Sequence, residues 1–452
     1  MREDLIRKYT IMEIRDYSLY PKQLFQDAVN YPLIISVKKE HPSSNNQVKI
    51  TVTNTAGDKR SFSIPQAELP LDRLDSKSPW ILAPYEIINI YRKIANNSVR
   101  LGDSYEIYMG AKSSADNIYV VKPITCMQGG LVKVELNDGN QIIIEEHILH
   151  PFIKGEDIDP FNYEYNEYVL FTHDTANFEP LWDPNQKLVL SSLGLLNQRL
   201  RVRVAGAALV YILDANGCRN FRNALRSLSN LGFSINAVTP CAVTECYEVL
   251  KGGSPVLRIS FATTNNGCEV YVDGLRIPNA PRITQYLMSN LDRLIRRDDY
   301  RADLPPWAIF RISQEKFSEY RIAWQEMAKY FEACHLPVWV TINLCGKEEK
   351  RLLVPKQTTY FIVERDKIKA LKLLLYLNSD LARALIKLWS WAARGGHYRH
   401  ISSHVGHLPI PNQLLNCSLW PWLKEIINSS SLDDLNKIGK DIYEKRGGEL
   451  IR

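Results

Sequence analysis

The sequence predicts an α+β fold with more than one domain, and three observations support that prediction. The chain has 452 residues, which is too long for one ordinary domain. Hydrophobic residues make up 45% and charged residues 23% of it, as in a globular protein rather than a disordered one. Short strand patterns dominate residues 101–172, whereas helical patterns lie at 282–297 and at 366–393, the second interrupted at Leu377–Ser379, so the chain contains both kinds of element.

The N-terminal residues 1–62 carry the patterns of a short α/β segment. Leu33–Val37 is a continuous apolar run, which is typical of a strand buried on both faces of a sheet. Val48–Val52 alternates, so we expect it to pair beside that run as an edge strand. Two or three strands with one short helix do not enclose a core. We therefore expect this segment to be the end of a larger sheet whose other strands are missing or supplied by another chain.

Changes of pattern divide the rest of the chain into a linker with an amphipathic helix (63–97), a strand-rich part (98–183), an inserted subdomain (184–281) and a last part with several helices (282–452). In the strand-rich part, turns such as Asn137–Asn140 separate the short strands. In the last part, we expect the helix at 366–393 to end at Gly395-Gly396, since glycine commonly follows the last helical residue.

Several kinds of catalytic motif are absent from the sequence. No G-x-G occurs anywhere, which argues against a glycine-rich dinucleotide turn. There is also no P-loop, no GxSxG elbow and no HExxH pair. A self-contained nucleotide-using enzyme is expected to show one such loop. The absences therefore favour a binding module or a subunit over a complete enzyme.

Charge, cysteines and hydropathy limit the partners and the compartment. The net charge of +6 permits a polyanionic partner without requiring one. The eight cysteines are scattered with no C-x-x-C pair, a pattern that fits a reducing cytoplasm better than a disulfide framework. The N-terminus has no apolar segment of signal-peptide type, and no run approaches the roughly 20 apolar residues that cross a bilayer. We therefore expect a soluble cytoplasmic protein with no membrane partner.

Seven short segments carry a resemblance to a known family. In chain order they are Leu24–Ile35, Leu101–Asp116, Leu149–Ile158, Thr358–Phe361, Tyr376–Ser379, Arg394–Arg399 and Leu408–Pro411. Together they resemble the TaqI-like, gamma-class adenine-specific DNA methyltransferases, as found in type II restriction–modification enzymes. The first segment resembles the final strands of the family's cofactor-binding domain, and the others resemble its DNA specificity domain.

The resemblance implies a TaqI-like specificity domain, formed by residues 98–183 and 282–452, preceded at 1–62 by the C-terminal fragment of an α/β methyltransferase sheet. In the family, a cofactor loop and an Asn-Pro-Pro-aromatic catalytic tetrad lie upstream of the specificity domain. No such tetrad occurs here, and Met1 follows the place where it is expected. Residues 184–281 match the family poorly, so nothing is transferred onto them.

The resemblance further implies that this chain is the DNA-recognition portion or subunit of an adenine-N6 DNA methyltransferase in a restriction–modification or phage-defence system. Its partners would be double-stranded DNA and a separate methyltransferase polypeptide. S-adenosylmethionine would be bound by the complete enzyme and not by this chain alone, and no catalytic residue is expected here. Two alternatives stay open: a protein–protein adaptor of a defence system that has lost DNA reading, and a complete enzyme with unrecognised motifs.

Phe25 matches the position where these enzymes carry an aromatic residue that can lie against an extruded adenine. Flipping a base costs unstacking energy, and an aromatic face recovers part of it. The alternative is a phenylalanine that anchors a short loop to the sheet.

Two polar loops are candidate DNA contacts. Lys112, Ser113 and Ser114 follow a strand and suit contacts to phosphates or base edges. Lys154 precedes Gly155, where the absence of a side chain would let the DNA backbone come close. The alternative for both loops is a solvated turn.

The segment Arg394–His400 is the best DNA-contact candidate in the sequence. Its glycines relax the backbone, Arg394 and Arg399 offer bidentate guanidinium groups, Tyr398 can stack, and His400 adds a polar ring. The alternative is a helix C-terminus whose cations suit the helix dipole.

A row of arginines lies in the inserted subdomain. Arg199, Arg201 and Arg203 alternate as residues on one face of a strand would, whereas Arg219, Arg222 and Arg226 have helical spacing. Residues 199–226 contain only one acid, Asp214. We weigh a surface that contacts the DNA backbone equally against a solvated basic surface.

Four histidines have the spacing of metal ligands on one face of a helix: His397, His400, His404 and His407. No nearby cysteine or carboxylate completes a site, and Gly396 and Gly406 argue against a continuous helix. We therefore expect no metal site.

Overall fold

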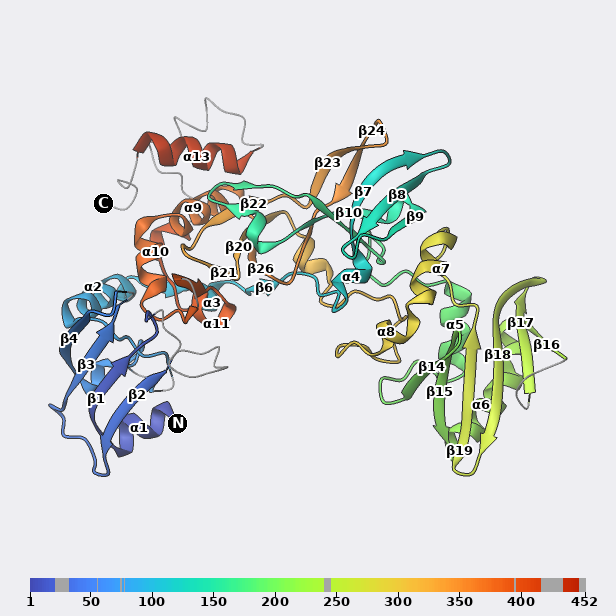
Figure 1. Cartoon of the computed structure of the whole chain (residues 1–452), viewed down its shortest axis with the longest axis horizontal. Coiled ribbons are helices and arrows are strands. Elements are labelled where there is room, and N and C mark those ends of the chain that lie inside the picture. Colours follow the sequence, from blue (N-terminus) through green and yellow to red (C-terminus); the bar gives the residue numbers. More distant parts are fainter. Residues whose placement is uncertain are drawn as a thin grey trace.

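The chain folds into several small sheets with helices packed against them, as the computed structural model shows for residues 1–20, 32–54, 56–73, 75–76, 78–239, 245–393, 396–415 and 434–446. The helical fraction is 29% and the strand fraction 38%, which confirms the predicted α+β class. The molecule is elongated, with the N-terminal sheet at one end and the sheet of the inserted subdomain at the other (Figure 1). None of the described helices has the length and apolar composition of a membrane-spanning helix.

The N-terminal part is a four-stranded sheet in the order β2-β1-β3-β4. It consists of α1 (Arg2–Lys8), β1 (Thr10–Asp16), β2 (Leu33–Lys38), β3 (Gln47–Thr53) and β4 (Lys59–Pro65). β1 runs parallel to β3 and antiparallel to β2. One face of the sheet is closed by fully buried apolar side chains, among them Ile14, Ile50 and Ile64. The sheet therefore encloses a core on that face.

The prediction that Leu33–Val37 is a central strand is wrong, and so is the prediction that Val48–Val52 is the edge strand. Among the described residues, β2 lies at the edge of the sheet and pairs with β1 alone, whereas β3 is flanked by β1 and β4. Leu33, Ile34 and Val37 are accordingly 45%, 49% and 41% exposed. An apolar run indicates a strand, but it does not identify the neighbours that cover it.

Strands from residues 98–183 pair with strands from residues 282–452. The pairs are β6 (Tyr108–Met109) with β26 (Thr359–Glu364), β10 (Leu149–Ile153) with β25 (Val354–Pro355), and β5 (Ser98–Arg100) with β29 (Pro409–Pro411). The two parts of the chain are therefore joined by backbone hydrogen bonds into common sheets.

The two largest sheets of this central body have six and four strands. The six-stranded sheet has the order β25-β10-β13-β7-β8-β9, with β13 (Glu167–Leu170), β7 (Val120–Met127), β8 (Leu131–Leu136) and β9 (Gln141–Glu145). The four-stranded sheet has the order β22-β20-β26-β6, with β22 (Ala333–Leu336) and β20 (Tyr320–Gln325). α9 (Lys367–Leu377) contacts three strands of the second sheet and is buried from Ala370 to Leu377, so it forms the centre of that core.

The helical segment predicted at 366–393 is divided at Leu377–Ser379, where the interruption was expected, but it ends before Gly395-Gly396. α9 stops at Leu377, and Ser379 caps the N-terminus of α10 (Asp380–Lys387) by accepting a hydrogen bond from the Ala382 amide. The chain then forms a β-hairpin of β27 (Ala392–Ala393) and β28 (His397–Arg399). Gly396 therefore lies in a hairpin turn, with a φ of +77°, and does not follow a helix C-terminus.

Residues 184–281 form a sheet of their own in the order β14-β15-β19-β18-β17-β16. The strands are β14 (Arg201–Ala205), β15 (Ala208–Asp214), β16 (Phe233–Ala237), β17 (Glu245–Lys251), β18 (Ser254–Thr264) and β19 (Gly267–Asp273), with the helices α5 (Pro184–Ser192) and α6 (Ala215–Ser227). Phe221 and Leu225 of α6 are buried against the sheet. α7 (Pro281–Ser289) and α8 (Leu291–Ile295) then lead back to the central body.

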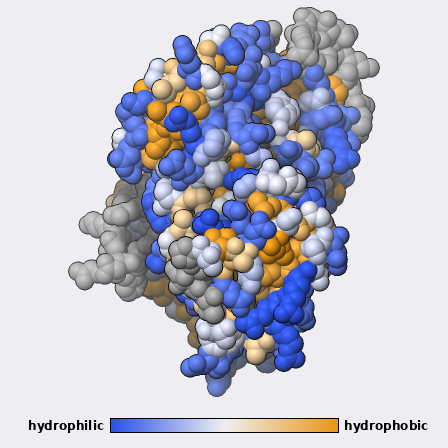
Figure 2. All heavy atoms as spheres, turned by 90° about the vertical axis from the view of Figure 1, so that its right-hand side faces the viewer, coloured by the Kyte–Doolittle hydropathy of each residue, from blue (hydrophilic) through white to orange (hydrophobic). Residues whose placement is uncertain are grey.

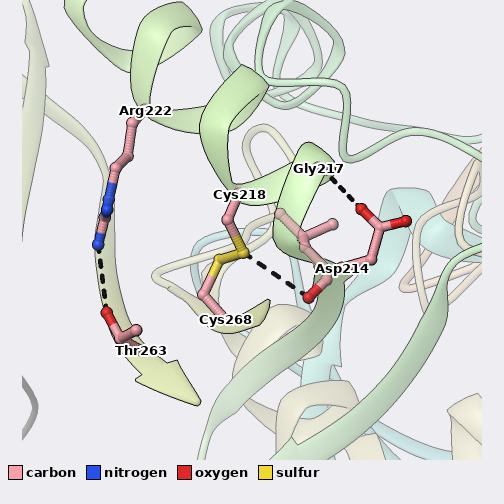
Figure 3. The surroundings of a disulfide bond; sticks show 7 residues. Asp214, Gly217, Cys218, Arg222, Thr263 and Cys268 are labelled. Carbon is pink, nitrogen blue, oxygen red and sulfur yellow. Dashed lines mark hydrogen bonds between the residues drawn. A yellow bond between two sulfur atoms is a disulfide. The ribbon is translucent and has the colours of Figure 1, made fainter. Parts of the chain in front are cut away.

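The interpretation of the cysteines as scattered thiols is wrong for at least two pairs. Cys218 of α6 is bonded to Cys268 of β19 (Figure 3), and Cys126 of β7 is bonded to Cys345, which follows β23 (Trp339–Leu344). The sequence separations of these pairs are 50 and 219 residues. Such long-range pairs leave no local spacing signal, so they could not be predicted from the sequence. The cysteine argument for a reducing compartment does not hold.

Candidate nucleic-acid interface

The loop Lys112–Ser114 is held by acidic side chains of the protein itself. Lys112 Nζ lies 2.5 Å from Asp299 Oδ2, and Ser114 Oγ donates to the same carboxylate at 3.2 Å. The hydrogen bond from Lys112, followed by its charge, keeps the pKa of Asp299 below its usual value. Ser113 is buried and its hydroxyl donates to Asp116. A phosphate would have to displace these partners, so we do not centre the interface on this loop.

Lys154 and Gly155 also face the protein. Lys154 Nζ lies 2.9 Å from Glu156 Oε1 and 3.5 Å from Glu167 Oε1. A Cβ placed on Gly155 would stand 2.4 Å from the carbonyl oxygen of Thr358. The glycine is therefore required by close packing against the chain's own backbone, and no open path for a nucleic-acid strand follows from it.

The arginines of the inserted subdomain lie on two opposite faces of its sheet. Arg203 Nη2 donates to Glu269 Oε2 at 2.7 Å and to Tyr271 at 3.4 Å. Arg201 is two residues away on the same strand and therefore shares that face. Cys268, which is bonded to α6, points to the other face because side chains alternate along a strand. Arg219, Arg222 and Arg226 are thus on the α6 side, away from Arg201 and Arg203, and Arg199 lies exposed in the turn before β14.

Two of the predicted site residues, Phe25 and Arg394, lie outside the described residues. The other three candidates of the segment Arg394–His400 lie together on or directly after β28: Tyr398, Arg399 and His400. β28 is the middle strand of a three-stranded sheet whose other strands are β27 and β21 (Met327–Ala328). The helix dipole does not explain the cations of this segment, because the segment is not a helix end.

Aromatic and cationic side chains lie on the two faces of this small sheet, with Trp391, Met327 and Arg399 on one face and Tyr398, near Lys387 and Tyr330, on the other. We call these six residues the aromatic surface. Trp391 is 63% exposed, Tyr330 is 56% exposed and Met327 is 38% exposed. Lys387 Nζ lies 4.8 Å from the ring centre of Tyr330 and 5.6 Å from that of Tyr398. The backbone amide of Arg399 donates to the carbonyl of Trp391 at 2.9 Å, which holds the tryptophan beside the arginine.

The charges around the aromatic surface are only partly compensated. Arg399 Nη1 lies 3.6 Å from Glu326 Oε1. Burial and the charge of Asp16, at the end of β1, raise the pKa of Tyr398. In the described part of the chain, no carboxylate is within ion-pair distance of Lys387 or Lys329, so both ammonium groups can meet an anionic partner.

His400 packs in the core beneath the hairpin of β27 and β28, so its ring does not face a ligand. It is 1% exposed, and burial lowers its pKa to about 4, so its ring is neutral at physiological pH. Its carbonyl accepts a hydrogen bond from Trp324 Nε1 at 2.8 Å. His404 is also buried and its Nδ1 contacts the carbonyl of Arg399. Across the described ranges no three metal-ligating side chains converge, and these histidines come from a strand, a loop and the short α11 (Ser402–Val405).

Sequence reasoning missed Tyr330, Lys387 and Trp391. Lys387 and Trp391 fell inside the segment interpreted as helical up to residue 393. Tyr330 follows the two-residue strand β21, which is too short to leave an alternating pattern. The signal that was available was the dense run of Arg, His and Tyr at 394–400, which marks the same hairpin.

A separate cavity of about 520 Å³ lies beside α2 (Tyr85–Asn96) and β5, and its lining includes Tyr91, Arg92 and Arg100. Both arginines are already paired, since Arg100 Nη2 lies 2.5 Å from Asp72 and Arg92 Nε lies 3.1 Å from Glu68. This pairing leaves neither guanidinium group free for an anionic ligand.

No model of a known protein family and no curated protein matches the chain. Among solved structures it is similar to the type IIG restriction endonuclease BpuSI, with 9% sequence identity and a TM-score of 0.29. The match covers 100% of this chain and 45% of that protein, so the chain spans less than half the length of its structural neighbour. At this TM-score the likeness supports no statement about function.

Proposed function

We propose that the chain binds double-stranded DNA through the aromatic surface. The observation that carries the proposal is Lys387, whose ammonium group lies near the rings of Tyr330 and Tyr398, together with the exposed Trp391 of the same hairpin. A base that leaves the stack exposes aromatic faces, on which Tyr and Trp side chains stack with a contribution of about 1–3 kcal/mol per base. Lysine and arginine next to the rings would neutralise the flanking phosphates.

We further propose that this DNA binding serves an adenine-N6 DNA methyltransferase in which a separate polypeptide provides the catalytic half. The support is the family resemblance of the sequence together with the absence of a catalytic tetrad and of any G-x-G. The residues present do not fit S-adenosylmethionine, because a glycine-rich turn is what lets a backbone approach such a nucleotide-like group. Cofactor binding is therefore assigned to the partner polypeptide.

A protein–protein adaptor is the second candidate. Exposed Trp and Tyr side chains also dominate the binding energy of protein interfaces, and Trp391 and Tyr330 have that character. The two candidates differ in their response to DNA, because an adaptor has no reason to bind a polyanion with an affinity that depends on salt.

The test compares the wild-type chain with the double variant Lys387→Gln, Trp391→Ala in fluorescence anisotropy with a labelled mixed-sequence duplex. We expect the affinity to fall roughly tenfold or more, since each factor of ten corresponds to about 1.4 kcal/mol. The matched control is Lys347→Gln, Trp339→Ala, which removes the same charge and another exposed tryptophan from the β23–β24 hairpin, where β24 is Lys347–Leu352. Equal effects of the two double variants would overturn the proposal.

A further inference from the structure

α6 presents an outward face of unusual composition. Three of its 13 residues, Cys218, Phe221 and Leu225, are buried against the sheet. The exposed residues include Asn216, Arg219, Asn220, Arg222, Asn223 and Arg226. The helix contains no Asp or Glu at all, and in the described part of the chain no carboxylate forms an ion pair with its arginines. The guanidinium of Arg222 turns back to the sheet, so the outward face consists of the guanidinium groups of Arg219 and Arg226 and of carboxamide groups, without counter-charges.

The helix is fixed rigidly to the sheet at several points (Figure 3). The Asp214 carboxylate caps its first turn by accepting from the Gly217 amide at 2.7 Å. The disulfide between Cys218 and Cys268 ties the same turn to β19. Further along, Arg222 donates to Thr263 Oγ1 at 3.2 Å, and its guanidinium lies 4.9 Å from the ring centre of Phe261. A helix held in this way keeps its outward side chains in a defined arrangement.

A merely solvated helix face does not explain this composition. Exposed faces of ordinary helices mix Glu with Lys or Arg, because oppositely charged pairs one turn apart stabilise the helix. Asparagine is also a poor helix former, since its side chain competes for backbone hydrogen bonds. The face seen in Figure 2, which has the inserted subdomain toward the viewer, carries broad hydrophilic areas with hydrophobic patches between them. The choice of Arg and Asn on the exposed face of α6 calls for a specific partner.

We infer that α6 is a recognition helix that lies in the major groove of the duplex and reads base edges. Arginine pairs with O6 and N7 of guanine and asparagine with N6 and N7 of adenine, and the groove, about 12 Å wide, admits one helix. At ~1.5 Å per residue α6 is about 20 Å long, which suffices to follow the groove over one site. The inference rests on the proposed DNA binding and deepens it, because it assigns sequence reading to the inserted subdomain, which the family resemblance left without a role.

The experiment begins with binding-site selection from a random-sequence duplex pool by the wild-type chain. The selected duplex is then measured with the triple variant Arg219→Ala, Asn223→Ala, Arg226→Ala, which leaves the anchoring Arg222 in place. We expect its affinity to fall roughly a hundredfold, as for the loss of several base and phosphate contacts. The matched control is Arg199→Ala, Arg201→Ala, Asn265→Ala, which removes the same charge and the same residue types from exposed positions of the same subdomain outside α6. For the control we expect a loss of less than about tenfold.

A second measurement distinguishes base contacts in the major groove from electrostatic attraction to the phosphates. Methylation of guanine N7 in the selected site should weaken binding by the wild-type chain, and this interference should disappear in the α6 variant. The pair Asn220→Ala, Asn223→Ala should relax the base preference at adenine positions. Circular dichroism and thermal unfolding verify that each variant is folded, which is expected because alanine is the best helix former.

Several outcomes would overturn the inference alone. These are equal losses in the two triple variants, a selection that yields no preferred sequence, or binding that depends on Lys387 and Trp391 but not on α6. Failure of the wild-type chain to bind any duplex would overturn the proposed function and this inference together. A loss confined to the α6 variant, with interference at guanine N7, supports it.

Discussion

Buried histidines set the pH range in which the protein is stable. Burial lowers the pKa of His150 and of His173 to about 3, and that of His335 to about 4. Above pH ~6.5 these rings are neutral in both the folded and the unfolded chain, so they do not affect stability. As the pH falls below ~6.5 the unfolded chain takes up protons that the folded chain does not, so stability is lost progressively until the folded-state pKa is reached.

Replacing His173 by phenylalanine should therefore reduce the sensitivity to acid. His173 is 4% exposed, its Nδ1 has no hydrogen-bond partner in the structure, and its ring lies 5.6 Å from that of Phe171. We expect His173→Phe to have little effect at pH 7.5 and to be more stable than wild type by about 2 kcal/mol at pH 5, since each pH unit corresponds to about 1.36 kcal/mol. Urea unfolding at both pH values measures this. If the difference in stability between the variant and wild type were the same at both pH values, the assignment of His173 as a neutral buried group would be contradicted.

Individual elements differ in how far the sequence reveals them. The alternation in residues 131–136 predicts β8, and the structure has a strand over Leu131–Leu136 with Val132 and Val134 buried. The run Leu33–Val37 also predicts a strand, but its place at the edge of the sheet depends on non-local pairing that no local pattern encodes. The hairpin of β27 and β28 was missed because apolar residues at helical spacing continue through Trp389, past the end of α10.

The candidate site was predictable only in part, because non-local packing brings several of its residues together. The density of cations and Tyr398 in the segment 394–400 marked the hairpin, whereas Tyr330 and Lys387 join it through tertiary packing. Lys112, Lys154 and Gly155 look equally suitable in the sequence. Their partners in the fold are Asp299, Glu156 and Thr358, and no sequence pattern identifies these residues as partners. Residue type therefore suggested the chemistry, and the fold decided which side chains are available for it.

The disulfide that anchors α6 should contribute measurably to stability. Cys218 and Cys268 close a loop with a sequence separation of 50 residues. The chain-entropy model gives about 4 kcal/mol for such a loop, with measured values of about 2–4 kcal/mol. We expect Cys218→Ser, Cys268→Ser to lower the free energy of unfolding by that amount, and a reducing agent to have the same effect on the wild type. Alkylation and mass spectrometry of the untreated protein check the bond directly, and free thiols at both positions would contradict it.

At the scale of the whole molecule, the absence of a glycine-rich loop leads to a prediction about the cofactor. Calorimetric titration of S-adenosylmethionine into the isolated chain should give no heat of binding at micromolar concentrations. Titration into a mixture with a methyltransferase polypeptide that carries the cofactor loop and the tetrad should give binding. Micromolar affinity of the isolated chain would contradict the division of the enzyme between two polypeptides.

The central claim, that the chain binds duplex DNA through cationic and aromatic side chains, is tested most directly by the salt dependence of that binding. Fluorescence anisotropy of the wild-type chain with a labelled duplex, repeated across a salt series, gives the affinity at each concentration. Each phosphate that is neutralised releases counterions, so the logarithm of the affinity should fall linearly with the logarithm of the salt concentration, with a slope of about −0.9 per phosphate contact. A flat response, or no binding at low salt, would contradict the claim and favour the adaptor.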